Sequence, residues 1–98
     1  MATNVSNVDP IKFLRKRYGF KGGLPHVYEV AILVMAKERT RQDSQDPLWN
    51  GELRVGADRL YAVMEHPALK PVVYRVEINP TGQIRLGLLR NWPKGLAA

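Results

Sequence analysis

The sequence predicts a small α+β domain with two or three helices and a C-terminal antiparallel β-hairpin. Its 98 residues, 45% apolar and 24% charged, have the length and composition of one globular domain. The first half of the chain contains a helix-start signal, in which a proline follows an N-cap residue, and a long apolar run. After residue 71, apolar and polar residues alternate, which is typical of strands. We therefore expect one domain over 1–98, with a flexible N-terminus over 1–8 and a short tail over 91–98.

The first helix is predicted to begin at Asp9 and Pro10, an N-cap followed by a proline, which favours the first helical position. The residues IKFLRKRY then place Ile11, Leu14 and Tyr18 on one side of a short helix. The other side of this helix is a stripe of cations, and the glycines after it predict a loop.

An apolar run that turns into a run of charges, YEVAILVMAKERTRQ, occupies residues 28–42. A helix and a buried strand both fit a run this short, and we favour the helix because Met35 to Arg39 are good helix formers without a breaker. Such a helix is apolar nearly all round up to Ala36, so we expect it to be covered on two sides. One side either docks on a partner or belongs to the core of the domain.

Between this run and the hairpin, the sequence predicts a polar loop, a brief strand and another helix. The loop covers residues 43–51, where the ring of Trp49 is either an exposed contact for a partner or a lid on the core. The brief strand is expected around 53–55. From Ala57, the residues ADRLYAVMEH predict a helix that Pro67 ends. Its inward side chains are predicted to be Leu60, Val63 and Met64.

The hairpin is predicted in the stretch KPVVYRVEINPTGQIRLGLLR. Apolar residues alternate with Arg and Glu over 72–78 and again, after a turn, from Ile84. A three-residue loop from Pro80 to Gly82 fits a type I turn followed by a left-handed glycine. This loop length predicts four cross-strand pairs, which are Ile78 with Ile84, Val76 with Leu86, Tyr74 with Leu88, and Glu77 with Arg85. Beyond the hairpin, the ring of Trp92 either anchors on it or stays exposed.

Positive charge is concentrated near the N-terminus. The chain has a net charge of +6 and a pI near 10.0, and +4 of that charge lies in the first 25 residues. This excess suits an acidic partner, either an acidic protein surface or a nucleic-acid-containing assembly. Cations beside aromatic rings hold phosphates while the rings stack on bases, but a merely solvated basic face has the same composition. The candidate binding residues are Lys12, Arg15, Lys16, Arg17, Tyr18, Phe20, Lys21, Arg39, Arg41 and Trp49.

No residue pattern in the chain predicts an enzyme, a metal site or a cofactor. The absence of cysteine excludes disulfides and thiolate chemistry, and His26 and His66 do not have the spacing of metal ligands. Ser6 and Ser44 lack the surroundings of a catalytic nucleophile. The longest apolar stretch, 30–36, is too short to span a membrane and no signal peptide is evident, so we expect a cytoplasmic protein.

Two short motifs resemble the omega subunit family of bacterial RNA polymerase. Tyr28-Glu29 before the apolar run and Lys37-Glu38-Arg39-Thr40-Arg41-Gln42 after it are similar to one motif of that family, and Lys70-Pro71 with Gly82-Gln83-Ile84 is similar to a second. The resemblance implies a non-catalytic subunit that clamps the largest polymerase subunit and helps assembly. It also implies helix between Lys70-Pro71 and Gly82, where the alternation of residues predicts a hairpin.

These observations lead to three functional hypotheses. The first is a non-enzymatic interaction protein that docks on a larger, nucleic-acid-handling assembly through its basic N-terminal helix and exposed aromatic residues. The second is direct DNA or RNA binding by the basic and aromatic residues around Tyr18. The third is a structural or virus-type assembly protein that self-associates through the hairpin edge or the apolar run.

Overall fold

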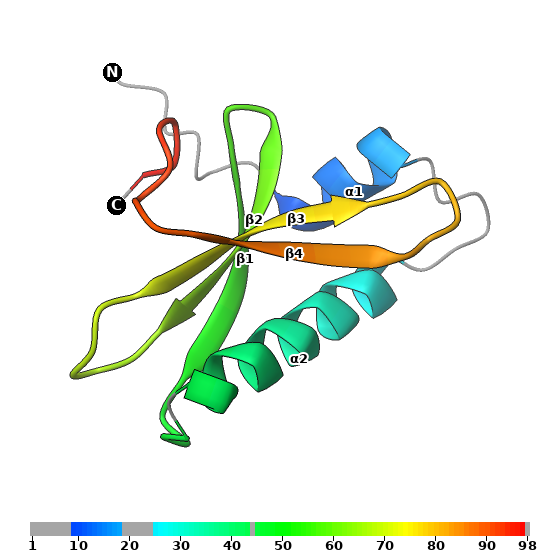
Figure 1. The fold of residues 1–98 in the computed structure, drawn as a ribbon. Coiled ribbons are helices and arrows are strands. Elements are labelled where there is room, and N and C mark those ends of the chain that lie inside the picture. Colours follow the sequence, from blue (N-terminus) through cyan, green and yellow to red (C-terminus); the bar gives the residue numbers. More distant parts are fainter. Residues whose placement is uncertain (1–8, 19–24, 44, 98) are drawn as a thin grey trace.

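The computed structural model describes residues 9–18, 25–43 and 45–97, in which two helices precede a four-stranded antiparallel sheet (Figure 1). Each strand pairs with the next one along the chain, so the order in the sheet is β1-β2-β3-β4. The elements are α1 (Pro10–Tyr18), α2 (Pro25–Asp43), β1 (Asn50–Gly56), β2 (Arg59–Glu65), β3 (Val72–Ile78) and β4 (Ile84–Leu89). The predicted flexible N-terminus over 1–8 lies outside the described residues.

Helix α1 begins where the sequence predicts. The carboxylate of Asp9 accepts a hydrogen bond from the amide of Ile11 (2.9 Å), and the carbonyl of Asp9 accepts one from the amide of Phe13 (3.0 Å). Asp9 is therefore the N-cap, and Pro10 occupies a position where a missing N–H costs nothing.

Both helices pack on one face of the sheet, which we call the helix face. Leu14 of α1 and Ile32 of α2 are fully buried there against side chains from the first three strands. A buried hydrogen bond joins the helix to the sheet, between the hydroxyl groups of Thr40 and Tyr74 (2.9 Å). The main core of the domain thus lies between the two helices and the sheet.

The segment predicted as a helix after residue 27 is helix α2, but it is covered on one side only. Ile32, which faces the sheet, is fully buried, whereas the side chains of Val27, Val30 and Val34 on the outward side are each at least half exposed. The expectation of cover on two sides is therefore wrong. A single sheet contacts one stripe of a helix, and the described part of the chain supplies no second layer over the valines.

The predicted fold class is wrong in its middle section. Residues 57–66, predicted as a helix, form a turn and strand β2, and the brief strand expected at 53–55 is the seven-residue strand β1. The described chain thus has two helices and a four-stranded sheet, not a single C-terminal hairpin. Strand β2 is buried on both faces, so its apolar residues follow one another without alternation, and helical spacing fits them equally well.

A two-residue turn at Ala57 and Asp58 joins β1 to β2, with Gly56 paired to Arg59 across it. Both turn residues have positive φ angles, 50° and 59°, as a type I′ turn requires. The usual sequences of such a turn are Asn-Gly and Asp-Gly. Ala-Asp carries no comparable hairpin signal, which is why the first hairpin was not predicted.

The predicted C-terminal hairpin is present, and its predicted register is confirmed by all four cross-strand pairs. In its loop, the amide of Gly82 donates to the carbonyl of Asn79 (2.8 Å), and the amide of Asn79 donates to the carbonyl of Gln83 (3.0 Å). Gly82 has a φ of 88°, the left-handed conformation that the turn chemistry predicts. This hairpin supplies β3 and β4, which are half of the sheet.

The second face of the sheet, which we call the tail face, is covered in part by the C-terminal segment 90–97 (red in Figure 1). The indole N–H of Trp92 donates to the carbonyl of Leu96 (2.8 Å), although the Trp92 ring remains 36% exposed. The apolar cluster under this segment consists of Tyr61, Val63, Val73 and Leu96. The predicted short tail therefore folds back on the sheet.

Candidate functional site

The cations of α1 point away from the core because the apolar side of the helix faces the sheet. Leu14 is buried, whereas Lys12, Arg15 and Lys16 are exposed and form no ion pair with a described residue. Arg17 lies on the flank nearest the turn between β1 and β2, where its guanidinium is 2.9 Å from the carboxylate of Asp58. One short helix thus presents four cations, of which one is paired.

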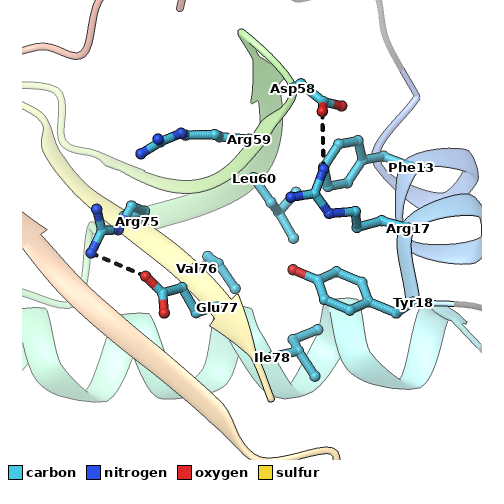
Figure 2. Close-up of a pocket in the computed structure, with 10 residues that line it drawn as sticks. All are labelled: Phe13, Arg17, Tyr18, Asp58, Arg59, Leu60, Arg75, Val76, Glu77 and Ile78. Atoms are coloured by element: carbon cyan, nitrogen blue, oxygen red, sulfur yellow. Dashed lines mark hydrogen bonds and ion pairs between the residues drawn. The ribbon is translucent and has the colours of Figure 1, made fainter. Parts of the chain in front are cut away.

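A cleft of about 440 Å³ lies between α1 and the ends of β2 and β3 (Figure 2). Figure 2 shows three arginine side chains around it, Arg17 from α1, Arg59 from β2 and Arg75 from β3, with Tyr18 extending from the helix toward the strands. The apolar part of the lining consists of Phe13, Leu60, Val76 and Ile78. We call this hollow the tyrosine cleft.

Two carboxylates hold two of the arginines at the tyrosine cleft. Asp58 pairs with Arg17, and Glu77 pairs with Arg75 at 3.0 Å. Arg59 forms no hydrogen bond or ion pair with a described residue. Three guanidinium groups against two carboxylates leave the rim with net positive charge, and a guanidinium fork fits the oxygens of a phosphate or carboxylate.

A second cleft, of about 590 Å³, lies on the other side of Arg17, between α1 and the end of β1. Lys12 and Lys16 line it, and we call it the lysine cleft. It shares Phe13, Arg17 and Asp58 with the tyrosine cleft, so the Arg17–Asp58 ion pair forms a common wall. The two clefts thus bring the cations of α1 close to cations of β2 and β3, which are distant from α1 in the sequence.

A third hollow, of about 410 Å³, lies between the end of α1, the start of α2 and the β3–β4 loop. Arg17, Tyr18 and Tyr28 line it beside the loop residues 79–82. Arg17 therefore borders three hollows, which makes it the centre of the candidate site.

Four of the five described candidate residues of the N-terminal region line these hollows. Lys12, Lys16 and Arg17 border the lysine cleft, and Tyr18 borders the tyrosine cleft. Arg15 is exposed on the opposite flank of α1 and lines none of these hollows. Phe20 and Lys21 lie outside the described residues.

The other three predicted residues lie elsewhere. The guanidinium of Arg39 donates a hydrogen bond to the carbonyl of Leu86 (2.7 Å) on the edge strand β4. This bond occupies a backbone group that another strand would otherwise pair with. Arg41 is exposed near the end of α2. Trp49 is only 4% exposed and its ring centre lies 5.0 Å from that of His66, so it is a lid on the core and not an exposed contact.

Sequence reasoning missed the part of the site that the sheet contributes. Arg59 and Asp58 belong to the segment predicted as a helix, so their position opposite α1 could not be inferred. Arg75 and Glu77 were placed correctly on a strand, but nothing local in the sequence indicates which other element that strand end meets. Only the pairing of β2 with β3 brings Arg59, Arg75 and Glu77 to one end of the sheet.

Within the described ranges, no group of three His, Cys, Asp or Glu side chains is placed to hold a metal ion. In the same ranges, neither helix is long and apolar enough to cross a membrane. No protein family, curated protein or solved structure matches the chain.

Proposed function

We propose that this protein is a non-enzymatic interaction domain that docks on an acidic partner in a nucleic-acid-handling assembly through the α1 surface. The proposal is supported by the exposed cations of one helix, Lys12, Arg15 and Lys16, which form no ion pair with a described residue and lie beside clefts that add further arginines. Concentrated positive charge attracts acidic partners and accelerates their association.

The chemistry of the side chains at these clefts supports binding. Guanidinium groups remain protonated at any ordinary pH, so they neither accept nor release a proton during a reaction. They do form forked, charge-assisted hydrogen bonds with carboxylates and phosphates. Arg17, Arg59 and Arg75 are therefore suited to hold an anion in place.

An RNA polymerase is one candidate for the assembly, on the motif resemblance to the omega subunit family. Tyr28 and the segment 37–42 of that resemblance lie at the two ends of α2. The stretch between Lys70-Pro71 and Gly82 contains strand β3, where the family has helix. We therefore rest the proposal on the α1 surface and treat the polymerase as one possible outcome of the test.

The test is purification of the tagged protein from its native host, with and without nuclease, followed by mass spectrometry. We expect a stoichiometric partner with the unaltered protein and its loss when Lys12, Arg15, Lys16 and Arg17 are replaced by Ser. The matched control replaces four exposed cations elsewhere, and these are Lys70, Arg85, Arg90 and Lys94. An unchanged partner with the α1 variant, or equal loss with the control, contradicts the proposal.

A further inference from the structure

We propose that the tyrosine and lysine clefts together bind one strand of nucleic acid, with phosphates on the cations and a base in the tyrosine cleft. This inference rests on the proposed function, because it names the chemistry that the α1 surface recognises. The ligand class is a single-stranded phosphodiester chain, since a strand with unstacked bases offers both its phosphates and its flat rings to a cleft.

Cations border both clefts. Lys12 and Lys16 border one cleft, Arg59 and Arg75 border the other, and Arg17 borders both. Arg17 extends from α1 and Arg59 and Arg75 extend from the tail face, so these three cations meet at the strand ends that line the tyrosine cleft. A chain that carries a negative charge at every repeat can contact the cations of both clefts at once. Positively charged grooves with adjacent rings are the usual site of single-strand binding.

Aromatic and apolar side chains line the clefts beside the cations. Phe13 borders both clefts, and in Figure 2 the ring of Tyr18 lies above Ile78 with its hydroxyl end toward Val76. Both clefts fall within the size range of small-molecule pockets, about 300 to 1,000 Å³. Phe13 and Tyr18 both pack in part against the core cluster, so the cleft has an apolar wall beside its cations. An acidic peptide would use the cations alone, whereas a nucleotide also offers a flat base to this wall, which favours a nucleobase.

Two carboxylates pair with two of the arginines at the tyrosine cleft. Asp58 and Glu77 hold Arg17 and Arg75 at the rim, and the four side chains are between 45% and 81% exposed to solvent. Exposed ion pairs contribute little to stability, so a phosphate can replace either carboxylate at small cost. The carboxylates thus orient the guanidinium groups before a ligand binds. They also compete with the ligand for these groups, so removing a carboxylate should strengthen binding.

The experiment measures binding of a fluorescently labelled oligothymidylate by polarisation over a series of salt concentrations. We expect the logarithm of the affinity to fall linearly with the logarithm of salt, and Arg59→Gln and Arg75→Gln each to reduce that slope by about 0.7. Arg15→Gln is the matched control, because it removes the same charge from the flank of α1 that lines neither cleft. Equal losses with Arg15→Gln and Arg59→Gln would overturn the assignment to the clefts.

Two further variants test the clefts through a gain of affinity, which a damaged fold cannot produce. Asp58→Asn and Glu77→Gln each remove a carboxylate from the rim, and we expect each to bind the oligonucleotide severalfold more tightly. Asn is chosen at position 58 because it tolerates the positive φ of 59° found there. Unchanged or weaker binding with both variants would contradict the proposal.

The last comparison separates the strand from other anions. An abasic strand with the same phosphates should bind at least about fivefold more weakly, because it cannot stack in the tyrosine cleft. Polyglutamate and inorganic polyphosphate should compete poorly with the oligonucleotide. If polyglutamate binds and the oligonucleotide does not, the inference fails while docking on an acidic protein stands, and if neither binds, the proposed function fails with it.

Discussion

The helix face and the tail face of the sheet are both covered, but by different kinds of structure. On the helix face, α1 and α2 cover a cluster to which the described part of the chain contributes twelve buried residues. On the tail face, the segment 90–97 covers a cluster of four described residues, Leu96 among them. The same four strands therefore have a thick regular layer on one side and a thin irregular segment on the other.

The tail face is also the face that carries the charges. Arg54 lies 2.6 Å from the carboxylate of Glu52 and 3.4 Å from that of Glu65, and it donates to the carbonyl of Ala97 (3.3 Å). Alternation along β2 and β3 places Arg59 and Arg75 on this same face. The helix face therefore contains most of the core of the domain, whereas Arg59 and Arg75 of the candidate site extend from the more thinly covered tail face.

The largest expected effect in this comparison is a truncation on the helix face. Ile32→Ala should lower the free energy of unfolding by about 3 kcal/mol, because Ile32 is fully buried and a cavity would remain between α2 and the sheet. Denaturant unfolding followed by circular dichroism measures it. The control is Val34→Ala on the outward side of α2, where half the side chain is exposed and we expect a change under about 1 kcal/mol. Similar losses for the two variants would contradict the one-sided packing of α2.

A smaller effect is expected on the tail face. Leu96→Ala should lower the free energy of unfolding by about 2 kcal/mol, because only a short segment presses this side chain onto the sheet and can relax when it is removed. Leu69→Ala, in the loop between β2 and β3, is the control with an exposed leucine. If Leu96→Ala costs more than Ile32→Ala, the tail face is not the weaker of the two.

The contact between the C-terminal segment and the turn at residues 57–58 should contribute less to the free energy of unfolding than Leu96 does. Gly95 has a φ of 83°, and a Cβ placed there would lie 2.8 Å from the Cβ of Ala57. Gly95→Ala should therefore cost about 1–2 kcal/mol in unfolding free energy, from the left-handed backbone and the clash together. In an Ala57→Gly background the clash disappears and the cost should fall, which a double-mutant cycle measures. Equal costs in the two backgrounds would show that the tail does not press on the turn.

The start of α1 and the second hairpin could be predicted from the sequence further than the first hairpin could. Asp9 and Pro10 are local signals of a helix start, and the alternation in β3 and β4, together with Pro80 and Gly82, determines a hairpin register. These are properties of neighbouring residues. The run in β2 has no period, because both faces of a central strand are buried, and so the first hairpin was mistaken for a helix.

The candidate site divides in the same way. Lys12, Lys16 and Arg17 could be grouped from the sequence because they lie on one helix. Arg59 and Arg75 join them only through strand pairing and the packing of α1 near the turn, which depend on contacts between distant residues. The exposure of an aromatic residue in a loop could not be predicted either. Trp49 stands beside turn residues in the sequence, and nothing there indicates that its ring is buried beside His66.

The smallest expected effect is a loss of stability in acid, and it arises on the helix face beside Trp49, a residue of the core cluster. Asp46 accepts a hydrogen bond from the amide of Leu48 (2.9 Å) and lies 2.8 Å from Nε2 of His66. The bond from Leu48, followed by the interaction with His66, lowers the pKa of Asp46 below its ordinary value of 3.8. His66 in turn accepts from the amide of Ala68 through Nδ1 (2.9 Å), which fixes the ring beside Trp49.

Because the pKa of Asp46 is lower in the folded state, its carboxylate contributes stability above its ordinary pKa, and this contribution is lost as the pH falls through the folded value. Thermal unfolding of the protein and of Asp46→Asn between about pH 6 and about pH 2 separates this group from the other carboxylates. The variant keeps an oxygen that accepts from Leu48 but has no charge to lose, so the gap in melting temperature between the two proteins should close in acid. If the difference in melting temperature stays constant over the whole range, the charge of Asp46 does not stabilise the packing of His66 beside Trp49.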